Sequence, residues 1–286
     1  QSIHAEDDIG RESTFFEWLF GKQYDDTISR PYGVFARNSK LVVTDLRKRG
    51  VLIFDLAAKR MNFMGGEGNL QTPASAVMDA AGNVYVADAG KDRILIYDPN
   101  GDYRTAFVIK DSKPVALAIN DRTGRLYVVD RKSHRVVVLS LEGKELFSFG
   151  RQGKEDGEFN IPLGVALDGN NRIYVLDSGN FRVQQFDENG KFLLKFGSAG
   201  DRHGFFSNPK GIALDSDGHL YVTDAAFNNF QIFNQQGDVL LSVGRMGSAP
   251  GYLYLPGGIA IDENDRIYVA DQFNARIQVF QYLKAP

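Results

Sequence analysis

The sequence predicts an all-β fold: a six-bladed β-propeller whose blades are four-stranded antiparallel sheets. Three observations predict it. A short strand motif that ends in aspartate recurs at intervals of 42 to 47 residues along the 286-residue chain. Each copy follows a proline-initiated strand and a polar turn. The chain also contains 30 glycines, 21 phenylalanines and 12 tyrosines, a composition typical of many short strands joined by tight turns.

The recurring motif consists of two apolar or aromatic residues, a valine, one variable residue and an aspartate. Its six copies end at Asp45, Asp88, Asp130, Asp177, Asp224 and Asp271. The strands that precede them open at Pro31, Pro73, Pro114, Pro162, Pro209 and Pro256. Self-similarity with a period of roughly 40–50 residues is the sequence signature of propellers and related repeat folds.

The fourth repeat shows how one blade is built. A strand opening at Pro162 leads through the turn 168–171 into the motif strand that ends at Asp177. The alternating strand RVQQFD follows, and the turn 188–190 joins it to the last strand, KFLLKFG. Polar turns between runs of alternating apolar residues are hairpin signals. Each repeat therefore supplies four antiparallel strands, which make one blade.

We expect the N-terminal segment to close the ring. Little chain follows Phe280, so the sixth repeat lacks an outer strand of its own. Residues 14–21 (TFFEWLFG) are similar to the outer strands of other repeats. They are expected to pair beside residues 276–282, because soluble proteins avoid an unpaired apolar sheet edge. Residues 1–13 are then a polar N-terminal tail and residues 14–286 a single propeller domain.

The repeat resembles a known family. The string G-x-x-G-x-x-x-G-x-F-x-x-P occurs at residues 150–162 and 197–209, and Y-V-x-D-x-x-N-x-R follows in the fourth and sixth repeats. This pattern is similar to the NHL repeat, and the resemblance covers nearly the whole chain. It implies a six-bladed propeller and favours a module that binds a partner, although a shared fold does not by itself define a function.

The motif aspartates are expected to be structural. An arginine follows five residues later in four repeats, which predicts the pairs Asp88–Arg93, Asp130–Arg135, Asp177–Arg182 and Asp271–Arg276. Partly buried carboxylates are normally paired in this way, so each pair would lock the loop of its blade. The fifth repeat departs from the pattern with Asn229, and the first has Gly50 at this position.

The composition argues against several kinds of site. The chain has no cysteine, so disulfides, thiolate zinc sites and cysteine nucleophiles are excluded. A net charge of −3 argues against DNA binding, and no apolar run is long enough for membrane insertion. The four histidines fall at unrelated places in the repeats and do not suggest a three-ligand zinc site. We therefore expect no catalytic residues, no metal and no cofactor.

One face of the disc carries the candidate binding residues. In an up-and-down blade the loops after the second and fourth strands lie on the same face, which we call the top face. The loops after the second strand are basic in the first three repeats and aromatic in the last three. The predicted partner-binding residues are Arg49, Lys91, Arg131, Lys132, Phe181, Phe227 and Phe273.

These features favour a non-catalytic scaffold that docks a protein or peptide partner through its top face, within a larger complex. Under this interpretation the chain is not an enzyme. The lack of cysteine and the start at Gln1 favour an extracytoplasmic location, either periplasmic or secreted. One alternative is a metal-dependent lyase or hydrolase that works in the central channel. A second is binding of single-stranded RNA, against which the acidic net charge argues.

Overall fold

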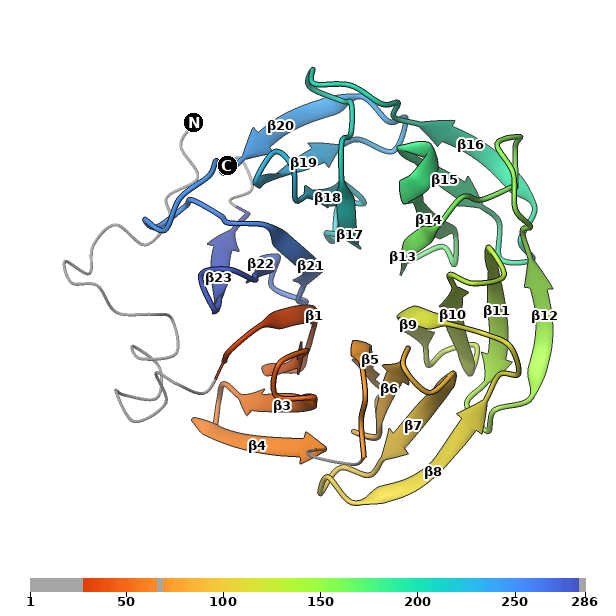
Figure 1. Cartoon of the computed structure of the whole chain (residues 1–286), viewed down its shortest axis with the longest axis vertical. Helices are drawn as coiled ribbons and strands as arrows, with labels where there is room; N and C mark the ends of the chain where they lie inside the picture. The colour runs from red at the N-terminus through yellow and green to blue at the C-terminus, as the bar shows by residue number, and fades with distance from the viewer. Residues whose placement is uncertain (1–27, 66–68, 283–286) are drawn as a thin grey trace.

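The computed structural model describes residues 28–65 and 69–282, which form six antiparallel sheets arranged around a central axis (Figure 1). This confirms the predicted six-bladed β-propeller. Five sheets have four strands each, and the described part of the sixth has three. Neighbours in each sheet are consecutive in sequence, so every blade is a simple meander that runs outward from the axis.

Each blade has its strands in the same order from the axis to the rim. The innermost strands are β1 (Pro31–Arg37), β5 (Pro73–Met78), β9 (Pro114–Asn120), β13 (Pro162–Leu167), β17 (Pro209–Leu214) and β21 (Pro256–Ile261). The second strands are β2 (Lys40–Asp45), β6 (Val84–Asp88), β10 (Arg125–Asp130), β14 (Ile173–Asp177), β18 (Leu220–Asp224) and β22 (Arg266–Asp271).

The third strands are β3 (Gly50–Asp55), β7 (Arg93–Tyr97), β11 (Arg135–Ser140), β15 (Arg182–Phe186), β19 (Asn229–Phe233) and β23 (Arg276–Gln281). The outer strands are β4 (Arg60–Gly65), β8 (Tyr103–Val108), β12 (Glu145–Phe149), β16 (Phe192–Phe196) and β20 (Val239–Val243). A short 3-10 helix, η2 (Ser178–Asn180), lies in the loop after β14.

The registers place the repeat residues at matching points of every blade. In the fourth blade Pro162 lies opposite Asp177, and the ladder is irregular next to this pair. Proline has no N–H to donate to the ladder, which explains its place at the first residue of the strand. Asp177 in turn lies opposite Arg182 on β15, so the aspartate stands between the proline and the arginine. The second, third and sixth blades bring the same three residue types together at the top face, whereas Gly50 and Asn229 lie opposite the aspartate in the first and fifth.

Apolar residues from adjacent blades form the core. One cluster joins Val129 and Val138 of the third blade to Val165 and Val175 of the fourth, and all four are buried. In the fourth blade the second strand, β14, is buried along its whole length, whereas the outer strand, β16, alternates between half-buried and exposed residues. Burial of each such side chain contributes roughly 1.5–3 kcal/mol to folding.

The ring closes where β21 lies beside β1. A Cβ atom on Gly258 would stand 2.8 Å from the backbone oxygen of Tyr32, so glycine permits this close approach. On the bottom face, the backbone N–H of Asn38 donates to the Glu263 carboxylate over 3.2 Å, which ties the first blade to the sixth. The predicted closing strand, residues 14–21, and the predicted tail, residues 1–13, lie outside the described residues.

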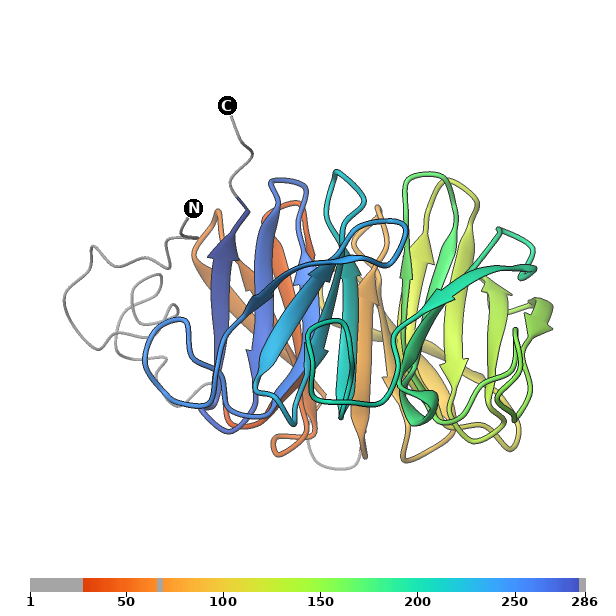
Figure 2. The ribbon, with the colours of Figure 1, turned by 90° about the horizontal axis from the view of Figure 1, so that it is seen from above.

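The disc has two distinct faces, seen edge-on in Figure 2. β23 ends on the bottom face, at the upper edge of that view, so the top face is the lower edge. In the described part of the chain, no helix has the length and hydropathy needed to span a membrane.

Candidate functional site

The six motif aspartates hold the loops of the top face together. All six side chains are buried. Asp45 accepts hydrogen bonds from the backbone N–H groups of Ser29 and Arg30, which lead into the first strand of its blade. Its other oxygen accepts from Arg47 and Lys48 in the loop that follows. The aspartate carboxylates therefore hold these loops in place, and their oxygens already accept hydrogen bonds from backbone N–H groups.

The predicted arginines lie beside these aspartates, at two different distances. Guanidinium nitrogens of Arg182 and Arg276 lie 2.8 Å from the carboxylates of Asp177 and Asp271. The other two pairs, Asp88–Arg93 and Asp130–Arg135, are longer, at 3.5 Å each. The tight pairs belong to the blades whose sequences contain the full N-x-R motif.

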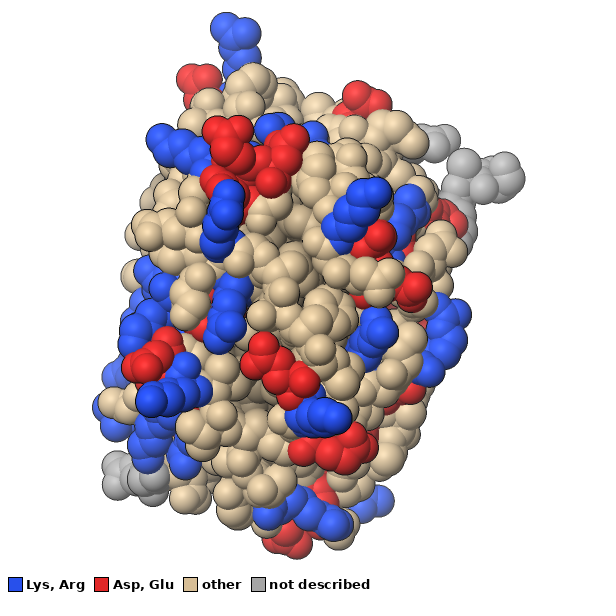
Figure 3. Space-filling model, turned by 90° about the vertical axis from the view of Figure 1, so that its right-hand side faces the viewer, with Lys and Arg blue, Asp and Glu red and all other residues tan. Residues whose placement is uncertain are grey.

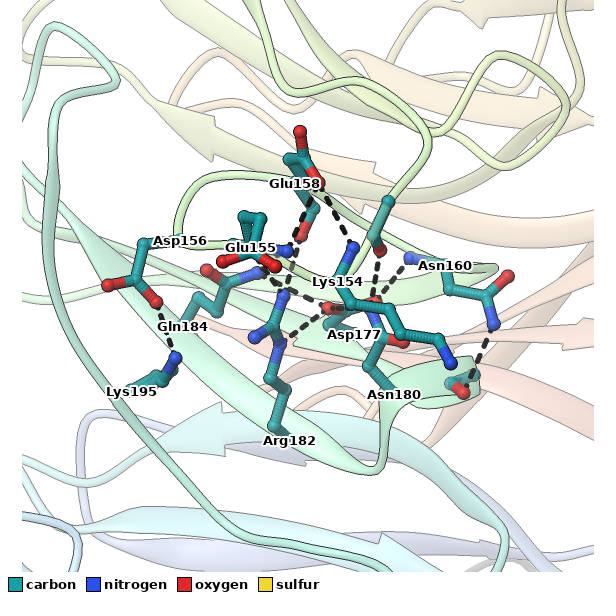
Figure 4. Close-up of polar contacts among 12 residues, drawn as sticks. Lys154, Glu155, Asp156, Glu158, Asn160, Asp177, Asn180, Arg182, Gln184 and Lys195 are labelled. Carbon is teal, nitrogen blue, oxygen red and sulfur yellow. Dashed lines mark hydrogen bonds and ion pairs between the residues drawn. The ribbon is translucent and has the colours of Figure 1, made fainter.

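The fourth blade shows what a tight pair does (Figure 4). Arg182 donates to Asp177 and also to the backbone oxygens of Glu155 and Glu158 in the loop that enters the blade. Gln184 donates to the same Glu158 oxygen and to Asp177. The guanidinium thus clamps loop 150–161 to the blade. Burial raises the pKa of the Asp177 carboxyl, against hydrogen bonds from Asn160, Asn180 and Arg182 that lower it.

The fifth blade lacks this clamp. Asn229 replaces the arginine, and its side-chain oxygen is buried without a hydrogen-bond partner among the described residues. Gln231 still donates to the backbone oxygen of Phe205, and Asp224 accepts from Ser207 and Asn208. The loop is therefore held without a guanidinium, and nothing in the structure explains the substitution.

The central channel is apolar along most of its length. Its lower part encloses about 200 Å³ and is lined by Val, Leu, Ile, Ala and Phe side chains together with Ser75. Its upper part encloses about 80 Å³ and shares Ser75 and five apolar residues with the lower part, so the two spaces adjoin each other. The Ser75 hydroxyl accepts a hydrogen bond from the backbone N–H of Leu117.

The top mouth of the channel is polar. At two positions after a repeat proline and one after a motif aspartate, the side chain differs from its counterparts in the other repeats. Tyr32 on β1 and Lys210 on β17 line the upper part of the channel. Arg131, directly after Asp130, interacts electrostatically with both. Tyr32 also packs against the apolar cluster of the second, third and fourth blades, so its ring leans away from its own blade. We call Tyr32, Arg131 and Lys210 the mouth triad.

The two titratable side chains on the channel wall have shifted pKa values. Burial lowers the pKa of the Lys210 ammonium, and the positive charge of Arg131 lowers it further, while Asp224 raises it. Burial raises the pKa of the Tyr32 phenol, and Arg131 opposes that shift. Asp224 is the nearby carboxylate, and four backbone N–H groups already donate to it.

The basic residues predicted for the first three blades are exposed. In the loops 46–49, 89–92, 109–113 and 131–134, the exposed cations are Arg47, Arg49, Lys91, Lys110, Lys113, Arg131 and Lys132. The only exposed carboxylate in these four loops is Asp111, which lies 3.7 Å from Lys132 in an ion pair between two exposed side chains. We call these seven residues the basic crescent. Figure 3 shows Lys and Arg gathered along the lower left of the disc, on the side of the top face.

The predicted aromatic half is less exposed than the sequence suggested. Phe181 adopts a left-handed backbone conformation and packs against the apolar cluster between the fourth and fifth blades. Phe227 is half-buried. Phe273 is 55% exposed, with the Tyr254 ring tilted beside it at 5.2 Å between centroids and the Arg30 guanidinium 5.9 Å from its ring centre. Of the three phenylalanines, Phe273 offers the main apolar contact surface.

The three described histidines belong to the third and fifth blades, and each has a polar partner. His134 accepts from the backbone of Ile161, His203 lies 2.9 Å from Ser242, and His219 lies 2.8 Å from Asp215. Among residues 28–65 and 69–282, no group of three or more His, Asp or Glu side chains is placed to hold a metal ion.

Comparison with known proteins agrees with this architecture. The family model of the NHL repeat matches residues 112–139, 159–186, 206–233 and 253–280. This chain is a six-bladed propeller that carries NHL repeats. The matched segments are the last four of the six repeats, and the first two blades have the same strand order. No curated protein matches the sequence.

Solved structures show the same fold at low sequence identity. Virginiamycin B lyase from Staphylococcus aureus is 14% identical, with a TM-score of 0.64 over 88% of this chain and 84% of the lyase. A gluconolactonase from Xanthomonas campestris is 16% identical, with a TM-score of 0.67 over 89% and 86%. Hydrazine synthase from Kuenenia stuttgartiensis is 12% identical, with a TM-score of 0.65 over 89% and 96%.

These structures overturn the expectation that the chain is not an enzyme. That expectation was drawn from the fold together with the lack of a recognisable catalytic motif. A lyase and a gluconolactonase share the fold, so the fold gives no ground for excluding catalysis. At these identities the likeness shows a common architecture alone.

Proposed function

We propose that the NHL propeller binds a protein or peptide partner through its top face, and that acidic groups of the partner meet the basic crescent. The observation that carries this proposal is the excess of cations in the four loops that define the crescent. Seven exposed Lys and Arg side chains face a single exposed carboxylate there. The whole chain has a net charge of −3, so the positive charge of the crescent is a local excess on a protein that is negatively charged overall.

The physical role of such a surface is to steer and orient a partner. Complementary charge raises the association rate and sets the docking orientation more than it adds affinity. Apolar contact has to supply part of the affinity, and the exposed Phe273 with Tyr254 and Arg30 offers it on the same face. The rigid blades below hold both surfaces at fixed positions, which suits a subunit of a larger extracytoplasmic complex.

Reversal of charge on the crescent tests the proposal. The triple variant Arg49→Glu, Lys91→Glu, Lys132→Glu should fail to retain a partner that the wild type captures from a native extract. A matched control reverses three exposed lysines of the bottom-face turns, Lys59, Lys144 and Lys191, and changes the net charge by the same amount. Equal capture by both triple variants would contradict the proposal, as would a captured species that is single-stranded RNA.

A second candidate function is catalysis at the channel mouth. It is favoured by the position of Lys210 on the wall of the upper channel, where burial and Arg131 lower the pKa of its ammonium and so ease the release of a proton from this amine. The structurally similar lyase and gluconolactonase show that the fold supports such chemistry in other proteins. Turnover of lactone or ester substrates by the wild type, lost in Lys210→Met but kept in Lys132→Met, would support it. Equal turnover by both variants would rule out Lys210.

A further inference from the structure

We infer that the top mouth of the channel is a binding site for a small carboxylate, held by Arg131, Lys210 and Tyr32, with its apolar chain in the channel below. This site is separate from the docking of an acidic partner. Docking uses Arg49, Lys91 and Lys132, in the loops between the second and third strands, whereas the carboxylate site lies at the mouth of the central channel. Arg131 is the one residue that the two surfaces share.

The positive charge at the mouth favours the binding of an anion. Neither the Arg131 nor the Lys210 side chain forms an ion pair or hydrogen bond with any described residue, although Arg131 is close enough to Lys210 to lower the pKa of its ammonium. The upper channel is lined by no carboxylate, and Lys210 is its only charged residue. Asp224 nearby is saturated by four backbone donors. The half-buried Lys210 ammonium and the exposed Arg131 guanidinium are therefore two like charges without an ion-pair partner among the described residues, and a bound anion would supply one.

The donors present match a carboxylate better than a phosphate. A guanidinium, an ammonium and a phenol can donate to the two oxygens of one carboxylate. A phosphate is usually cradled by several backbone N–H groups at a turn or helix end. The residues that line the upper channel all lie on extended strands, so it contains no turn or helix end of this kind.

The size and apolar lining of the lower channel determine which kind of chain the carboxylate can carry. The lower channel encloses about 200 Å³ between apolar side chains from all six blades. An apolar cavity of about 150 Å³ can hold a molecule the size of benzene, so this space accommodates a short hydrocarbon chain. A carboxylate at the mouth with an apolar chain along the axis thus satisfies both the charge and the lining.

Calorimetric titration with hexanoate tests the inference, with butyrate and hexanol as companion probes. Hexanoate should bind more tightly than butyrate, by about fourfold for each added methylene. Hexanol, which has the chain without the charge, should bind at least about tenfold more weakly than hexanoate. Comparable binding of hexanol and hexanoate, or no heat with hexanoate, would overturn the inference.

Variants locate the site. Arg131→Met and Lys210→Met should each weaken hexanoate binding by at least about tenfold, because each removes one charged donor. Lys132→Met, one residue from Arg131 but on the rim, should bind hexanoate like the wild type. Lys210→Arg keeps the charge and should retain most of the affinity, which separates loss of the donor from loss of the fold. Unchanged affinity in both methionine variants would place the ligand elsewhere and refute the assignment.

The carboxylate could be a free small molecule or the carboxyl end of a peptide, and N-acetyl-leucine distinguishes them. Tighter binding of hexanoate assigns the site to a free carboxylate. Tighter binding of N-acetyl-leucine assigns it to a chain terminus whose side chain enters the channel, and the carboxylate chemistry holds in both cases. The crescent triple variant retains Arg131, so it should lose its partner and keep hexanoate, which separates failure of one proposal from failure of the other.

Discussion

Removal of the Arg182 guanidinium should be among the most damaging single changes to a loop residue of this protein. The side chain is 8% exposed and its partner Asp177 is fully buried, with 2.8 Å between the charged atoms. Arg182→Met leaves the carboxylate without its cation and removes one donor from each of two backbone oxygens, those of Glu155 and Glu158. Breaking a buried pair by removing one partner costs about 3–5 kcal/mol.

The expected loss can be measured by urea unfolding and by thermal denaturation. For a domain of this size, 1 kcal/mol corresponds to roughly 2–4 °C, so the melting temperature of Arg182→Met should fall by roughly 6–20 °C. Arg135→Met is the matched control. Its pair with Asp130 is longer, at 3.5 Å, and Arg135 is 29% exposed, so its loss should cost about 1 kcal/mol or less. Equal destabilisation by the two variants would refute the reasoning that burial and distance set the energy of these pairs.

Two further predictions concern the ring junction and the buried tyrosines. Gly258→Ala should lower the unfolding free energy by about 1–3 kcal/mol, because its Cβ would meet the Tyr32 backbone oxygen at 2.8 Å, whereas Gly169→Ala, with nothing within 4 Å, should stay within about 0.5 kcal/mol of the wild type. Urea unfolding of both variants checks this, and similar losses would contradict it. Burial, and then the Asp79 carboxylate, raise the pKa of Tyr85 to about 12, so its proton is bound more tightly in the folded state. Its stabilising contribution is complete below about pH 10 and is lost as the pH rises through about 12. The difference in tyrosinate absorbance between wild type and Tyr85→Phe should titrate near pH 12, and a midpoint near 10 would contradict the assignment.

The sequence predicted the blades because their determinants are local and repeated. The motif aspartate, the proline before it and the polar turns recur at a fixed spacing, and the structure places Pro162, Asp177 and Arg182 side by side as that spacing implies. The exposed basic loops could be predicted for the same reason. They follow directly from the position of each loop in the repeat.

The mouth triad could not be predicted from the repeat pattern because its members are far apart in sequence. Tyr32, Arg131 and Lys210 come from three different blades, and only closure of the ring brings them together. A usable signal was present at the residue after each proline. It is apolar or glycine in four repeats, Ala74, Val115, Leu163 and Gly257, and it is Tyr32 and Lys210 in the other two.

The exposure of the loop aromatics depended on details that the repeat pattern does not encode. Phe181 occupies the left-handed conformation at the end of η2, which turns its ring toward the fifth blade. Phe273 occupies the comparable loop of the last blade, yet its ring remains largely exposed beside Tyr254. Which phenylalanine points outward is decided by the neighbouring blade, and a sequence pattern within one repeat carries no information about it.

The central claim is that the top face binds an acidic partner through the basic crescent, and the salt dependence of that binding tests it most directly. The dissociation constant of the captured partner would be measured across a series of salt concentrations for three proteins: the wild type, the Arg49/Lys91/Lys132→Glu variant and the Lys59/Lys144/Lys191→Glu control. Wild type and control should lose affinity steeply as salt rises, whereas the crescent variant should bind weakly at every concentration and respond little to salt. A crescent variant with the affinity and salt response of the wild type would show that the partner binds elsewhere on the propeller.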